Sequence, residues 1–105
     1  MPHVIFTDQA KRDLVRLADF MREKDPATGK RVIKTILEST GKLAGFPAIG
    51  KPVKDYEALP YARELVIPFG SAGYNVLYDY TPDSDSVIVM AIRHNREAGY
   101  KPSET

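Results

Sequence analysis

The chain has 105 residues, 43% of them hydrophobic and 28% charged, which is typical of one soluble globular domain spanning residues 1–105. Fifteen basic and fourteen acidic residues give a net charge of +1, so there is no overall basic excess of the kind that nucleic-acid-binding domains carry. The absence of cysteine excludes disulfides, thiol catalysis and cysteine-ligated zinc.

The first part of the chain predicts a strand and a pair of helices. His3–Phe6 is a short apolar run that suits a strand, and the first ten residues do not resemble a signal peptide. Thr7 is a good helix N-cap, and Asp25-Pro26 starts a second helix that should end near Gly45. One apolar face of the first helix is formed by Ala10, Leu14, Leu17, Ala18 and Met21. We therefore expect a helical hairpin in a cytoplasmic protein that does not enter a membrane.

The second part predicts a loop and a three-stranded antiparallel meander. Residues 46–61 contain several prolines and no periodicity, which is typical of a connecting loop. Three strands should follow at Ala62–Phe69, Tyr74–Tyr80 and Ser86–Ile92, joined by short turn-rich links. The last strand is apolar on both faces, so we expect it to be central. The fold class is α+β, in the order β-α-α-β-β-β.

The strand region resembles a known family. The stretches RELVIPFGSAGYNVLYDY and VIVMAIRHNREAGY, together with the order of elements before them, are similar to the RelE/ParE superfamily of type II toxin–antitoxin toxins. The resemblance implies a growth-inhibiting toxin that binds a cognate antitoxin in a hetero-oligomer. It also implies one of two targets, since RelE-like toxins cut messenger RNA on the ribosome and ParE-like toxins inhibit DNA gyrase.

The residues at the RelE-type catalytic places favour the ParE branch. In the RelE pattern two lysines precede the serine-glycine turn, an arginine follows the glycine-tyrosine pair, and an arginine and a tyrosine come near the end. Aligned on Gly73-Tyr74, the lysine places hold Val66 and Pro68, and the first arginine place holds Asn75. Only the last two places keep their residue types, as Arg96 and Tyr100. RNA cleavage needs cations to stabilise a growing negative charge, so we predict a binding protein that inhibits gyrase.

Two alternatives stay open at the sequence level. A ribosome-dependent mRNA endoribonuclease would use His94, Arg96 and Tyr100, with Arg63 or Glu64 in support, because histidine can act as a general base. A non-toxic homologue that only binds its antitoxin is the other. For the gyrase hypothesis, the expected target contacts are Arg93, His94, Arg96 and Tyr100, with Tyr100 as an exposed aromatic anchor.

The remaining expectations concern the antitoxin, Arg63 and metals. We expect Leu14, Leu17, Tyr74 and Tyr78 to contact the antitoxin, with packing in the core as the alternative for the two tyrosines. We expect Arg63 to form an ion pair at the start of its strand. His3 and His94 lie far apart in the chain, without cysteine partners, so neither a metal nor a cofactor is expected.

Overall fold

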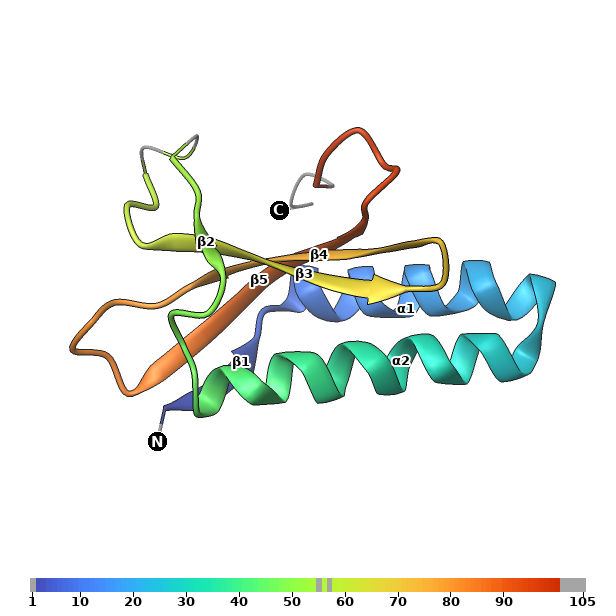
Figure 1. The fold of residues 1–105 in the computed structure, drawn as a ribbon, viewed down its shortest axis with the longest axis horizontal. Helices are drawn as coiled ribbons and strands as arrows, with labels where there is room; N and C mark the ends of the chain where they lie inside the picture. The colour runs from blue at the N-terminus through green and yellow to red at the C-terminus, as the bar shows by residue number, and fades with distance from the viewer. Residues whose placement is uncertain (1, 55, 57, 101–105) are drawn as a thin grey trace.

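A computed structural model describes residues 2–54, 56 and 58–100 of the protein (Figure 1). Two helices lie on one side of a five-stranded sheet, which confirms the predicted α+β class. The elements in chain order are β1 (His3–Phe6), α1 (Asp8–Lys24), α2 (Pro26–Gly41), a short 3-10 helix η1 (Lys42–Ala44), β2 (Lys51–Pro52), β3 (Ala62–Phe69), β4 (Ala72–Asp79) and β5 (Ser86–His94).

The two helices begin at the predicted caps. The Thr7 side chain accepts a 3.1 Å hydrogen bond from the Ala10 N–H, which satisfies one of the free donors at the start of α1. Asp25 ends α1 and caps α2, and Pro26 takes the first position of α2, where no N–H is needed. The second helix ends at Gly41, earlier than expected, because the chain tightens into η1 before Gly45.

The sheet has the strand order β1-β5-β4-β3-β2. The antiparallel β3-β4-β5 meander is confirmed, but the prediction that the last strand is central is wrong. Strand β4 occupies the middle of the sheet, and β5 lies between β4 and β1, with which it pairs in parallel. Strand β5 is apolar because both of its faces pack: Val87, Val89 and Ile92 lie in the core beneath the helices, and Ala91 lies in a small cluster on the other face. The expected loop at 46–61 contains the two-residue strand β2, which pairs with β3 at Arg63 and Glu64.

A β-bulge in β5 changes which of its side chains face the helices. Leu77 of β4 pairs with Ala91, but the next residue, Tyr78, pairs with Val89, so β5 has one extra residue at Met90. As a result both Val89 and Ile92 belong to the core beneath the helices, although three positions separate them.

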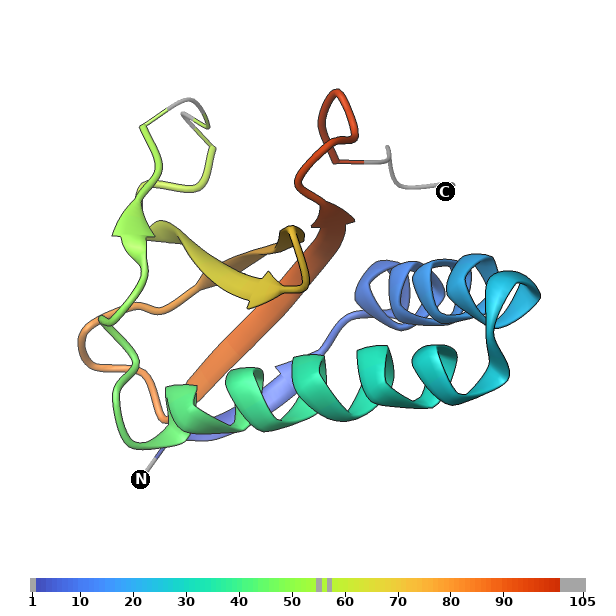
Figure 2. The same cartoon turned by 45° about the vertical axis from the view of Figure 1, so that its right-hand side comes forward.

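The helices cover one face of the sheet and leave the other open (Figure 2). The main core lies between helices and sheet and contains residues from α1, α2, η1 and three strands. Leu17, Tyr74 and Tyr78 are 5%, 2% and 0% exposed, and Leu14 packs partly buried against the same core. Three of the four side chains expected at the antitoxin interface therefore lie inside the protein, because their strands and helix turn that face inward.

Candidate functional site

The four residues predicted as target contacts divide between the two faces of the sheet. Arg93 pairs across the strands with Asn75, and His94 pairs with Tyr74. Successive side chains of a strand point to opposite faces, so Arg93 lies on the open face and His94 on the helix side. The His94 ring meets the Tyr74 ring edge-on, with centroids 5.4 Å apart. The structure therefore brings His94 together with Arg96 in one place, and Arg93 together with Tyr100 in another.

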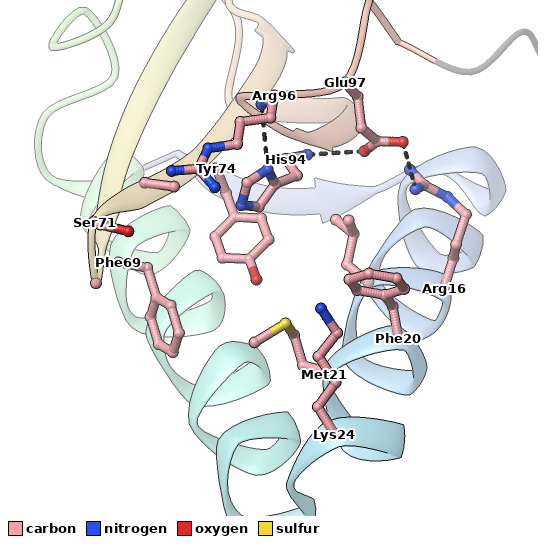
Figure 3. A pocket seen from close by; sticks show the side chains of 13 residues that line it. Arg16, Phe20, Met21, Lys24, Phe69, Ser71, Tyr74, His94, Arg96 and Glu97 are labelled. Carbon is pink, nitrogen blue, oxygen red and sulfur yellow. Dashed lines mark hydrogen bonds and ion pairs between the residues drawn. The ribbon is translucent and has the colours of Figure 1, made fainter.

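His94 and Arg96 line a cleft of about 710 Å³ on the helix side (Figure 3). The cleft lies between α1, the β3–β4 hairpin and the turn that follows β5. Apolar side chains dominate its lining, contributed by Leu17, Phe20, Met21, Phe69 and Tyr74. Such a lining favours a partner that brings apolar side chains of its own.

The rim of the cleft is positively charged. Lys24 places its ammonium 4.6 Å from the centre of the Phe20 ring. Arg96 is exposed, and its guanidinium forms no ion pair with any residue in the described part of the chain. Arg16 is held by Glu97, with 2.8 Å between Nη1 and Oε2. A partner with carboxylates placed around an apolar centre would complement this cleft.

The turn after β5 holds His94 and Arg96 in a fixed arrangement (Figure 3). The Glu97 carboxylate accepts a 2.9 Å hydrogen bond from the His94 N–H and also binds Arg16. The Arg96 N–H donates to His94 Nδ1 over 3.2 Å, so the neutral ring carries its proton on Nε2. His94 can therefore offer a donor to a bound partner, while Arg96 offers its charge.

Tyr100 lies against the open face of the sheet, so the expectation of an exposed anchor is wrong. Its hydroxyl donates a 2.6 Å hydrogen bond to Glu64 Oε2, and the Arg93 guanidinium sits 5.3 Å from its ring centre. The ring packs against a small cluster formed by Ala62, Leu77 and Ala91. Burial first, and then the hydrogen bond to the Glu64 carboxylate, raise the pKa of Tyr100 far above its usual value.

Three of the four places that RelE-like toxins fill with cations lie together on this open face, while the fourth, held by Arg96, lies at the cleft. Val66 pairs with Asn75, which pairs in turn with Arg93, so these three residues form one row across β3, β4 and β5. Val66 and Pro68 are exposed and uncharged. Arg93 is the cation of the row, and its Nη1 donates to the carbonyls of His94, Asn95 and Glu97.

Arg63 and Glu64 have structural partners. Among the described residues no carboxylate forms the expected ion pair with Arg63; its Nη1 donates to the backbone carbonyls of Ala48 and Gly50 at 3.1 and 2.7 Å. The reason is that the 46–50 segment folds over the start of β3 and presents its carbonyls there. Glu64 projects from the opposite face, where it accepts from Tyr100. Neither of them lines the cleft that contains His94.

Sequence reasoning missed Asp13 and Arg16, which support the cleft from α1. Asp13 is 1% exposed, and its Oδ2 accepts a 2.9 Å hydrogen bond from the Ile92 N–H next to the bulge. Arg16 Nη2 lies 3.4 Å from Asp13 Oδ1. A signal was present, because Asp13 stands three residues after Ala10 and four before Leu17, on the apolar face of the helix. A carboxylate at such a position requires a buried donor.

Two further features of the described residues bear on function. Within residues 2–54, 56 and 58–100, no helix is long and apolar enough to cross a membrane. In the same part of the chain, no three histidine or carboxylate side chains gather where they could hold a metal ion.

Comparison with known proteins gives consistent matches over most of the chain. Residues 4–99 match the sequence model of the family described as "ParE toxin of type II toxin-antitoxin system, parDE". Two relatives from Caulobacter vibrioides are "Toxin RelE3", 31% identical over 92% of this chain and 98% of the relative, and "Toxin RelE1", 32% identical over 90% and 94%. A solved structure titled "Chromosomal ParDE TA system from P. aeruginosa" contains a similar fold. Its TM-score is 0.72 with 16% identity, over 90% of this chain and 96% of that one.

Proposed function

The chain belongs to the ParE toxin family within the RelE/ParE superfamily, and from this membership we propose that it is a toxin that inhibits DNA gyrase by binding it. It would be neutralised by a cognate antitoxin and would act in the cytoplasm, where gyrase works. The proposal makes the protein a binding partner that traps its target without bond chemistry of its own.

The observation that supports gyrase over RNA is the composition of the open face. Cleavage of RNA by its 2′-hydroxyl needs cations near the phosphate that gains charge. The two places where RelE-like toxins carry lysine hold the exposed residues Val66 and Pro68. The place where they carry the first arginine holds Asn75. The neighbouring Arg93 is the cation of this row, and its Nη1 is directed to three backbone carbonyls of the turn that follows β5.

We propose that Arg96 and His94 contact the target and that Arg93 and Tyr100 support them from the other face. Arg96 is exposed on a turn that Glu97 and Arg16 hold in place. A fixed turn presents a charge without the loss of conformational entropy that a mobile one would suffer on binding. Arg93 and Tyr100 make contacts within the protein, so they act by holding the same turn and the chain that follows it.

The cleft is the surface that we propose for the antitoxin. Its apolar lining includes Phe20, which is exposed, and its rim includes Lys24 and Arg96. An antitoxin segment with apolar side chains on one face and carboxylates beside them would match both features. Leu14 lies on the same helix and keeps part of its surface accessible, unlike the buried Leu17, Tyr74 and Tyr78.

A specific observation favours the ribonuclease as a second candidate. His94, Arg96 and the Tyr74 ring meet in one cleft, and an imidazole donor, a cation and a phenol are groups that RNA cleavage can use. The two Caulobacter vibrioides relatives are named RelE toxins. A ribosome-dependent cut would then occur on the helix side of the sheet.

Induction of the chain without its antitoxin separates these functions. The gyrase proposal predicts growth arrest, loss of supercoiling by purified gyrase, and intact messenger RNA. Shortened transcripts with normal supercoiling would contradict it and support the ribonuclease. Normal growth, with the protein folded and bound to its antitoxin, would identify a non-toxic homologue. The antitoxin encoded beside the toxin serves as the control, because its co-expression should restore growth.

A further inference from the structure

The segment between α2 and β2 exposes two large apolar side chains. Phe46 is 67% exposed and Ile49 is 58% exposed. They stand three positions apart on one turn, where the Ile49 N–H donates to the Phe46 carbonyl over 3.2 Å. We refer to residues 46–49 as the apolar turn. Exposed apolar groups are common singly, but two on one ordered turn form a surface that a partner can bury.

The turn is held from below by two side chains that are partners across the strands, Arg63 of β3 and Tyr78 of β4. The Tyr78 hydroxyl donates to the Pro47 carbonyl and accepts from the Gly50 N–H, each over 2.8 Å. Arg63 donates to the carbonyls of Ala48 and Gly50. Four hydrogen bonds to the backbone therefore fix the turn and leave both apolar side chains outside.

Gly50 makes this close approach possible. A Cβ atom at that position would lie 2.7 Å from the Tyr78 hydroxyl oxygen and 2.8 Å from the Glu64 carbonyl oxygen. Both distances are shorter than non-bonded contact allows, so a side chain here would push the segment away from the sheet. A buried tyrosine, an arginine and a glycine therefore fix the conformation of a turn whose own side chains are mostly exposed.

Exposed lysines flank the apolar turn in the sequence. Residues 41–54 contain three lysines and no aspartate or glutamate, and Lys42, Lys51 and Lys54 are all exposed. None of the three has an ion pair with any residue in the described part of the chain. The charge fits a partner surface with an apolar centre and carboxylates at its edge.

The apolar turn lies far from the cleft. Arg63, which holds the turn, and Phe69, which lines the cleft, are six residues apart on β3. At about 3.3 Å per residue they are separated by roughly 20 Å. Figure 2 shows the α2–β2 segment and the β3–β4 hairpin at opposite ends of β3. A segment confined to the cleft therefore leaves the apolar turn uncovered.

We propose that the apolar turn is a second docking surface, which binds the toxin's protein target through an acidic surface with an apolar centre. The inference rests on the proposed function, in which that target is gyrase. It assigns target binding to two separate places, the turn that carries Arg96 and the apolar turn.

The test compares the double variant Phe46→Ser, Ile49→Ser with the wild-type protein on purified gyrase. The toxin concentration that halves supercoiling should rise at least about ten-fold, because side chains at the centre of an interface carry much of the binding energy. The affinity for the cognate antitoxin, measured by calorimetry, should stay within about two-fold, since antitoxin in the cleft does not reach the turn. Val15→Ser removes an equally exposed apolar side chain (59%) from α1 and should change neither quantity.

A second variant, Arg63→Met, keeps both apolar side chains but removes two of the four hydrogen bonds. It should weaken gyrase inhibition by a smaller factor, about three-fold, because the turn then loses entropy on binding. An unchanged gyrase response of the double variant would overturn the proposal, and so would a loss of antitoxin affinity. If the wild-type protein stops growth without inhibiting gyrase, the proposed function fails, and the variants are compared on growth arrest. Full arrest by the double variant would then overturn the second docking surface.

Discussion

Arg93 and His94 are neighbours in β5, yet their side chains leave the sheet on opposite faces. Arg93 pairs with Asn75 and lies under the Tyr100 ring, whereas His94 pairs with Tyr74 and opens into the cleft. The basic and aromatic residues that look like one site in the sequence therefore lie on two faces of the sheet. His94 lines the cleft on the helix side, and Arg93 contacts Tyr100 on the open face.

This division predicts different effects for two arginines. Arg93→Ala should lower the free energy of unfolding by about 1–2 kcal/mol, because three carbonyls and an aromatic ring lose their cation. Arg96→Ala should change it by less than about 0.5 kcal/mol, as expected for an exposed side chain, while weakening toxicity about ten-fold or more. Urea unfolding and growth assays measure the two effects. Equal loss of stability in both variants would contradict the assignment.

The bond between Tyr100 and Glu64 should contribute measurably to stability. Tyr100→Phe removes a 2.6 Å hydrogen bond to a carboxylate and should lower the free energy of unfolding by about 1–2 kcal/mol. A double-mutant cycle with Glu64→Ala should give a coupling of about 1 kcal/mol. Strictly additive effects would show that the two side chains do not act as a pair.

Alkaline pH should lower the stability of the protein by deprotonating Tyr100. The pKa of Tyr100 in the folded protein is raised by burial and by the Glu64 carboxylate, while in the unfolded chain it is near the ordinary value of about 10. Above that pH the unfolded state releases a proton that the folded state keeps, so stability is complete below about pH 10 and falls as the pH rises further. Tyr74 and Tyr78, whose pKa values burial also raises, add to the effect. Unfolding curves at increasing pH measure this loss, and the free energy of unfolding of the Tyr100→Phe variant should fall less steeply than that of the wild type.

Asp13 should be among the most sensitive positions in the helices. Asp13→Ala leaves the buried Ile92 N–H without an acceptor and removes one of the carboxylates that Arg16 contacts. The free energy of unfolding should fall by about 2–4 kcal/mol. Asp13→Asn keeps an oxygen acceptor and should cost about half as much. Thermal unfolding with both variants is the measurement. The expectation fails if Asp13→Ala unfolds at the wild-type temperature.

Two glycines should respond in opposite ways to alanine. Gly50→Ala forces a methyl group against Tyr78 and Glu64, and should destabilise the protein by about 1–3 kcal/mol. Gly41 closes α2 in a helical conformation, and a Cβ there meets nothing within 4 Å, so Gly41→Ala should be neutral or stabilise by up to about 1 kcal/mol. Chemical denaturation of both variants compares them directly.

Local patterns predicted most of the elements. The caps at Thr7 and Asp25 and the strand at Ala62–Phe69 lie where they were expected, because capping and alternation depend on neighbours in the chain. The parallel pairing of β1 with β5 and the short strand β2 were not predicted. Both join residues that are far apart in the sequence, and no local signal encodes such contacts.

The arrangement of the candidate site residues in space could not be predicted from the sequence. Tyr100 was expected to be exposed because it follows the last strand, but Glu64, 36 positions earlier, holds it against the sheet. Tyr74 and Tyr78 were expected either in the core or at the antitoxin surface, and they lie in the core because the helices cover the face from which they project. In each case the deciding contact comes from another element.

The sequence by itself determined the family, the order of elements and the absence of cations at Val66 and Pro68, because these depend on residue identity and short-range spacing. Only the tertiary structure decided that His94 and Arg96 share a cleft with α1 while Arg93 and Tyr100 secure the opposite face. The physical reason is that strand pairing sets the face on which each side chain emerges, and helix packing sets which face stays open.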